Sequence, residues 1–100
     1  MTKVEAVELI REAFPDAEAD SWKAYDFQWI PRGEKLEIWW TQFTVVASDG
    51  AQVHGQVKIP LELLGTGPEK DAEVNLLIQR ARRDTDSLLK HQWGRTHDQS

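Results

Sequence analysis

The run from Leu36 to Ala47, LEIWWTQFTVVA, constrains the fold of this chain more than any other stretch. Aromatic and β-branched residues dominate the run, and it contains neither Gly nor Pro, which is the composition of a β-strand. Turn-forming sequences lie on both sides of it, Pro-Arg-Gly at 31–33 and Ser-Asp-Gly at 48–50. We therefore expect it to be the central strand of a three-stranded antiparallel meander.

The two flanking segments alternate with the period of two that strands show. In the first, Ser21 to Ile30, one face carries aromatic residues and the other carries polar ones: Tyr25, Phe27 and Trp29 against Asp26 and Gln28. In the second, Gln52 to Ile59, the two faces carry Val53, Gly55, Val57 and Ile59 against Gln52, His54, Gln56 and Lys58.

The turn at residues 48–50 allows a prediction of the register of the second hairpin. A three-residue loop with Gly50 in the left-handed conformation pairs Ala47 with Ala51 and leaves one face apolar and one face mostly polar. The first hairpin is ambiguous, because Leu36, Ile38 and Trp40 fall on the face opposite Trp39 and Phe43. Either a bulge near Trp39 and Trp40 changes the phase, or both faces are covered there.

Two amphipathic helices are expected at the ends of the chain. Thr2 and Glu5 match a capping box, and an apolar stripe of Val4, Val7, Ile10 and Phe14 predicts a first helix that ends near Ala13, before Pro15. The second helix is expected from Pro68 to about His91, with an inner stripe of Val74, Leu77, Ile78, Ala81, Thr85 and Leu88.

These elements predict a single α+β domain over residues 1–93, in the order α-β-β-β-α with both helices on one face of the sheet, and a polar tail over residues 94–100. The order resembles that of double-stranded-RNA-binding domains. The basic residues that open the second helix of that family are replaced here by Pro-Glu-Lys-Asp-Ala-Glu at 68–73, and the Gly-Pro-x-His pattern of its first hairpin is lacking. The resemblance is one of topology, and no residue role is carried over from it.

Composition indicates a folded protein of the cytoplasm. The chain has 100 residues, 40% of them hydrophobic, and a net charge of −5. The lack of cysteine excludes a disulfide framework, a thiolate nucleophile and a Cys-based metal site. No apolar stretch is long enough to span a membrane, so we expect no membrane association.

Two groups of residues are candidates for binding a partner. The polar sheet face offers Trp40, Gln42, His54, Gln56 and Lys58, with Asp26 and Gln28 as possible additions, which suits either a small ligand or a second copy of the chain. The second helix offers Arg80, Arg82 and Arg83, which suit phosphates or an acidic partner; the simpler interpretation is a solvated face with pairs such as Arg80 with Asp84 and Arg82 with Asp86.

No catalytic motif is present. Asp26 and His54 would make an acid–base pair, but no nucleophile accompanies them, and the spacing of His91 and His97 is not that of metal ligands on a helix. We therefore expect a non-enzymatic interaction protein without cofactor or metal, which forms homodimers through its sheet or binds another protein. The alternatives are nucleic-acid or acidic-partner binding through the second helix, and small-ligand binding on the polar sheet face.

Overall fold

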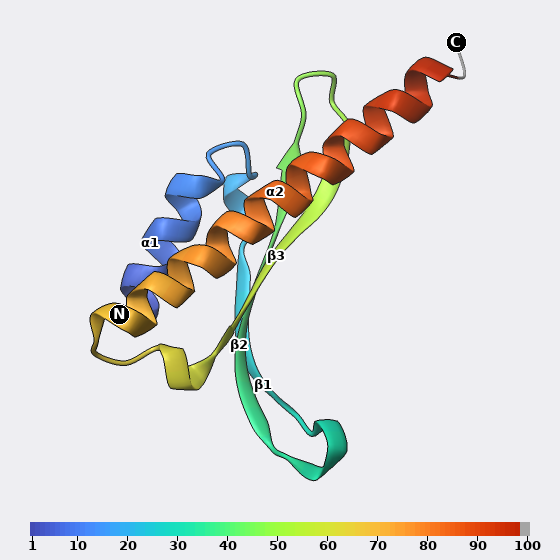
Figure 1. Ribbon diagram of the computed structural model, residues 1–100. Coiled ribbons are helices and arrows are strands. Elements are labelled where there is room, and N and C mark those ends of the chain that lie inside the picture. The colour runs from blue at the N-terminus through green and yellow to red at the C-terminus, as the bar shows by residue number, and fades with distance from the viewer. Residues whose placement is uncertain (99–100) are drawn as a thin grey trace.

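The computed structural model describes residues 1–98, with side chains for residues 1–30 and 32–91. It confirms the predicted α+β fold and the order α-β-β-β-α. Figure 1 shows both helices on the same side of the twisted sheet, with the long α2 crossing β3. The helices and strands are α1 (Lys3–Ala13), β1 (Lys23–Trp29), β2 (Leu36–Val46), β3 (Gln52–Pro60) and α2 (Pro68–Asp98).

Helix α1 begins and ends where its sequence predicts. The Thr2 hydroxyl accepts a hydrogen bond from the Glu5 amide at 3.2 Å, and the Glu5 carboxylate accepts one from the Thr2 amide at 3.2 Å, which together form the capping box. The buried residues of the helix are Ala6 and Ile10. Val4 is 69% exposed, so its assignment to the inner stripe was wrong.

The second hairpin has the predicted register. Val45 pairs with Val53, and the Ala47 amide donates to the Ala51 carbonyl at 2.8 Å. Gly50 has a φ of 89°, a conformation that glycine adopts without the steric cost of a Cβ. Alternation along β2 and β3 then places one set of side chains under the helices and the other set on the opposite face.

The first hairpin contains no bulge. Pairing runs without interruption from Lys23 opposite Gln42 to Trp29 opposite Leu36. Ile38 is only 8% exposed and lines a hollow together with Leu63 and Leu77. Of the two alternatives left open by the sequence, coverage of both faces is therefore the correct one at Ile38.

The core lies between the helices and one face of the sheet. At its centre the ring of Phe43 packs 4.5 Å from the ring centroid of Phe14 and 4.5 Å from that of Trp22. The buried cluster comprises Ala6, Ile10, Phe14, Trp39, Phe43, Val45, Val53, Val57, Ile59, Val74 and Ile78.

Helix α2 is longer than predicted, because it continues to Asp98 rather than ending near His91. Residues 94–98 of the predicted tail thus belong to the helix, while residues 99 and 100 lie outside the described part of the chain. Val74, Ile78 and Thr85 of the predicted stripe are buried, but Leu88 is 51% exposed. The buried face instead continues by a four-residue step from Thr85 to Leu89, which packs against the core.

Candidate functional site

The face of the sheet that lies opposite the helices, here called the open face, holds most of the predicted binding residues. Because directly opposed residues of antiparallel strands project to the same side, the register assigns the side chains to faces. Two cross-strand rows lie at the centre of the open face: Tyr25, Trp40 and Lys58 form one, and Lys23, Gln42 and Gln56 form the other.

Strand β1 turns the side that carries Tyr25, Phe27 and Trp29 toward the open face, and not the side that carries Asp26 and Gln28. Asp26 and Gln28 were considered as additions to the polar face, but Asp26 pairs with the core residue Trp39 and projects to the helix side. There its two carboxylate oxygens accept hydrogen bonds from the Lys3 ammonium, each at 3.0 Å. The open face therefore receives Lys23 and the three aromatic side chains Tyr25, Phe27 and Trp29 from β1, and the predicted additions Asp26 and Gln28 were wrong.

Three rings form a contiguous cluster on the open face, here called the aromatic surface: Tyr25, Phe27 and Trp40. The Trp40 ring centroid lies 5.4 Å from that of Tyr25 and 5.5 Å from that of Phe27. The Lys58 ammonium lies 4.9 Å from the Trp40 centroid, within the range of a cation–π interaction. The Trp40 indole N–H donates to the side-chain oxygen of Gln56 at 3.1 Å, which orients the ring.

The aromatic surface is accessible and continues into further apolar groups. Tyr25 is 44% exposed, and Trp29, which follows it on the same face of β1, is 54% exposed. Ile30, immediately after the strand, is 61% exposed. Exposed apolar side chains that lie side by side are typical of protein interaction surfaces, whereas isolated ones are common on any protein.

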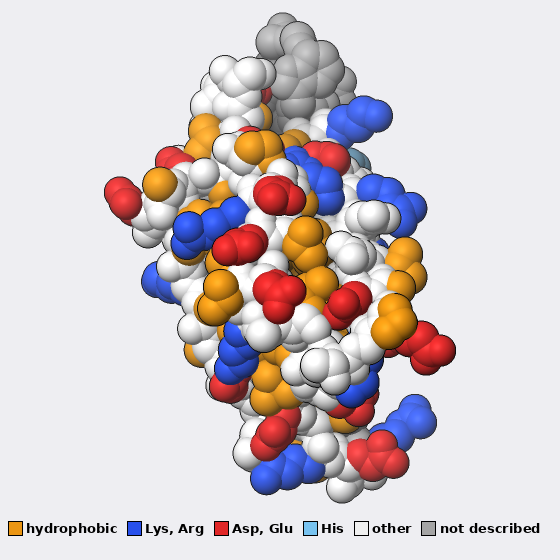
Figure 2. All heavy atoms as spheres, turned by 90° about the vertical axis from the view of Figure 1, so that its left-hand side faces the viewer, with side chains coloured by type: hydrophobic (Ala, Val, Ile, Leu, Met, Phe, Trp, Pro, Cys, Tyr) orange, Lys and Arg blue, Asp and Glu red, His pale blue; other side chains and the backbone are white. Residues whose placement is uncertain are grey.

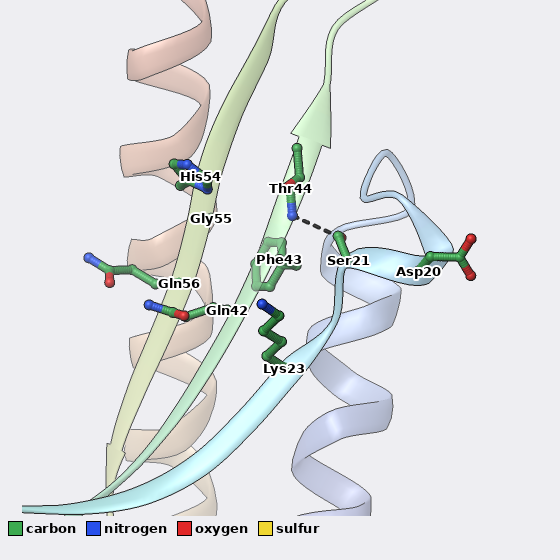
Figure 3. Close-up of a pocket in the computed structure, with 9 residues that line it drawn as sticks. All are labelled: Asp20, Ser21, Lys23, Gln42, Phe43, Thr44, His54, Gly55 and Gln56. Atoms are coloured by element: carbon green, nitrogen blue, oxygen red, sulfur yellow. Dashed lines mark hydrogen bonds between the residues drawn. The ribbon is translucent and has the colours of Figure 1, made fainter.

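A polar hollow of about 470 Å³ adjoins the aromatic surface on the open face. Figure 3 shows Gln42, His54 and Gln56 on the same side of β2 and β3, and Asp20 pointing away from them. The Ser21 hydroxyl, at the rim, donates to the Glu18 carbonyl at 2.7 Å and accepts from the Thr44 amide at 2.9 Å. Both bonds are to backbone groups, so the Ser21 side chain ties the turn at residues 18–21 to β2.

The acid–base pair considered from the sequence is not brought together. His54 lies on the open face of β3, while Asp26 projects to the other side of the sheet. Within the described part of the chain, no group of three or more His, Cys, Asp or Glu side chains is arranged to hold a metal ion.

The basic residues of α2 separate into two kinds. Arg80 and Arg83 are exposed, but Arg82 is half-buried and is used within the fold. Its guanidinium donates two hydrogen bonds to the carboxylate of Asp16, at 2.7 and 3.0 Å, and a third to the Ala13 carbonyl at 3.2 Å. It also pairs with Asp86, as the sequence spacing predicts, and lies 4.6 Å from the Phe14 ring centroid.

This arrangement shifts the ionisation of both partners. Hydrogen bonds from the Arg82 guanidinium hold the pKa of the Asp16 carboxyl below its ordinary value, and the same bonds raise the pKa of Arg82.

Figure 2 shows acidic side chains interspersed with basic ones on the face of the molecule that α1 borders. Since Arg82 is engaged, the predicted basic cluster is reduced to Arg80 and Arg83, which weakens the phosphate-binding alternative.

The chain is thus a small α+β protein, with two helices on one face of a three-stranded sheet and aromatic side chains exposed on the opposite face. Comparisons with protein-family models, curated proteins and solved structures found no match to this chain. Among residues 1–98, no helix has the length and apolarity needed to cross a membrane.

Proposed function

We propose that this chain is a small non-enzymatic interaction protein that forms homodimers through the open face of its sheet, with the aromatic surface at the contact. The observation that carries the proposal is the exposure of Tyr25, at 44%, directly beside Trp40 and in line with the exposed Trp29. Aromatic residues at such positions supply a large apolar area at low cost in side-chain entropy.

A second copy of the chain is the simplest occupant of this surface. Homodimers with a two-fold axis are the commonest soluble oligomers, because one self-complementary patch serves both partners. Lys58 and the Gln56 amide contact Trp40, and the Gln42 amide oxygen accepts a hydrogen bond from the Tyr25 hydroxyl, which gives the surface the apolar centre and polar rim that interfaces show.

Light scattering coupled to size-exclusion chromatography tests the proposal. The wild-type chain of 11.5 kDa is expected to elute with about twice that mass at micromolar concentrations. Tyr25→Lys places a charge at the contact and is expected to weaken dimerisation at least about tenfold, which corresponds to about 1.4 kcal/mol. Tyr25 is preferred to Trp40 for this test because Trp40 is half-buried and packs on Phe27.

Val4→Lys is the matched control, since Val4 is also an exposed apolar residue, at 69%, but belongs to α1. This variant is expected to dimerise as the wild type does. A wild-type chain that stays monomeric up to high micromolar concentration, or a Tyr25→Lys variant that dimerises with unchanged affinity, would contradict the proposal.

A further inference from the structure

Strand β1 forms an open edge of the sheet. Six of its seven residues are exposed, and the seventh, Phe27, is half-buried. The other edge strand, β3, borders α2, and residues of the two elements together line a hollow. Natural edge strands are usually interrupted by proline, by a bulge or by several charges, because an uninterrupted edge offers unpaired backbone groups to another strand. β1 contains no proline and pairs with β2 without a bulge, and its two charged residues are Lys23, at the start of the strand, and Asp26, whose charge is paired with that of Lys3.

The hydrogen bonds of β2 show which backbone groups of β1 point outward. The Val46 amide donates to the Asp16 carbonyl at 3.1 Å, and the Thr44 carbonyl accepts from the Glu18 amide at 2.8 Å. Even-numbered residues of β2 therefore direct their backbone toward the β1 side, and they stand opposite the odd-numbered residues of β1. It follows that the N–H and C=O groups of Ala24, Asp26 and Gln28 point away from β2, toward the open edge.

We infer that two copies of this chain pair antiparallel along β1, with the two-fold axis at Tyr25, and form one continuous six-stranded sheet. This inference rests on the proposed self-association and refines it: the contact is made at the β1 edge of the open face, where Tyr25 lies, and not by packing one open face on the other. Side chains of the same face meet across such a pairing, so the aromatic surfaces of the two copies adjoin at the axis. The outward backbone groups of Ala24 in one copy then bond to those of Asp26 in the other.

Charge repulsion favours the register with its axis at Tyr25 over the register with its axis at Asp26. An axis at Asp26 would place the two Asp26 carboxylates directly opposite each other, which is unfavourable. With the axis at Tyr25, each Asp26 faces Ala24 of the second copy, and each Lys23 faces Phe27 of the second copy. The Lys23 ammonium then lies beside an aromatic ring, and like charges are kept apart.

Backbone conformation disfavours a third register, with the two-fold axis at Phe27. An axis at Phe27 would extend the pairing to Ile30 and beyond, where the chain enters the turn at Pro31–Gly33 and Arg32 adopts a φ of 53°. With the axis at Tyr25 the pairing spans residues 22–28, and Trp22 has the extended dihedral angles of −69° and 126°. The paired segment is therefore already in the conformation that it needs.

Proline substitution at the open edge tests the inference. Ala24→Pro removes an amide that points outward and leaves the bonds between β1 and β2 intact, as proline is tolerated on the free side of an edge strand. We expect dimerisation to weaken at least about tenfold, with an unchanged circular dichroism spectrum. Ala24→Thr, which keeps the amide and favours a strand, is the matched control and is expected to dimerise normally.

Disulfide formation supplies a second test, which the lack of native cysteine makes simple to interpret. In the inferred register Tyr25 forms a non-hydrogen-bonded pair with its copy, with Cα atoms about 4.5 Å apart, a separation that a disulfide spans. A Tyr25→Cys chain is expected to cross-link to a covalent dimer under mild oxidation. A Gln56→Cys chain, whose cysteine lies on the open face of β3, is expected to stay uncross-linked.

The outcomes separate this inference from the proposed function. A dimer that is insensitive to Ala24→Pro, or a Tyr25→Cys chain that does not cross-link, would overturn edge pairing. If Gln56→Cys cross-links in its place, the two open faces pack against each other, and self-association through the open face stands. A wild-type chain that is monomeric would overturn both.

Discussion

Replacement of Gly55 by alanine is expected to lower the free energy of unfolding by about 3 kcal/mol, which is a large part of the stability of a typical small domain. A Cβ atom at this position would lie 2.2 Å from Cε2 of Phe43, well inside van der Waals contact. The Phe43 ring is 2% exposed and lies against the rings of Phe14 and Trp22, so a shift away from the new Cβ would disturb both ring contacts. Urea unfolding followed by tryptophan fluorescence measures the change.

Gly65→Ala is the matched control. The added Cβ at Gly65 would meet only the Lys70 side chain, at 3.2 Å from its Nζ atom, and a flexible chain end can move aside. Its effect is expected to be within about 0.5 kcal/mol. A Gly55→Ala variant that unfolds at the same urea concentration as the Gly65→Ala variant would show that the core around Phe43 is looser than the structure indicates.

A double-mutant cycle tests whether the Phe43 ring is the cause of the expected loss. Phe43→Ala alone is expected to destabilise by about 4 kcal/mol, since it leaves a cavity in the core. With the ring absent, the alanine at position 55 meets no atom of Phe43, and Gly55→Ala should then add little further loss. The two changes are therefore expected to be strongly non-additive.

Local sequence signals predicted most of the fold. The capping box at Thr2 and Glu5 involves residues three positions apart, and the turn before Ala51 needs only a glycine with positive φ. Both depend on interactions within a few residues, so their outcome is contained in the local sequence. The register of the second hairpin followed from the turn, because every later pair along the two strands is fixed by the first.

The face assignment of β1 was not predictable in the same way. Six residues, 30–35, separate β1 from β2, and a loop of that length does not fix a register by itself. Alternation identified Tyr25, Phe27 and Trp29 as one set, but it did not say that this set lies on the open face. The charge pattern contained a clue to the face, because Asp26 lies on the helix side, where its carboxylate forms an ion pair with Lys3 of α1.

The same limit applies to the candidate site as a whole. Alternation, together with the register set by the turn at residues 48–50, predicts one shared face for Trp40, Gln42, His54, Gln56 and Lys58, and they do lie there. The contribution of Tyr25 and Phe27 was missed because it depends on pairing between segments. The role of Arg82 was missed for a similar reason, since its partner Asp16 is 66 residues away in the sequence and no local pattern links them.

Replacement of Arg82 by alanine is expected to lower the free energy of unfolding by about 2 kcal/mol at neutral pH. Its guanidinium joins three elements of the fold: it bonds to the Ala13 carbonyl at the end of α1, to Asp16 in the following loop and to Asp86 in its own helix. Arg80→Ala is the control, because Arg80 lies exposed on the same helix and its removal should cost no more than about 0.5 kcal/mol.

The pH dependence of this loss identifies its origin. The pKa of Asp16 is lower in the folded chain than in the unfolded chain, so its contribution to stability is complete above the ordinary pKa of about 3.9 and is lost as the pH falls through the folded-state value. In Arg82→Ala that contribution is largely absent at every pH. The stability difference between wild type and Arg82→Ala should therefore narrow between pH 5 and about pH 2, as measured by urea unfolding at each pH. A difference that stays constant over this range would mean that Arg82 acts through its packing on Phe14 and its bond to Ala13, and that its ion pair with Asp16 contributes little.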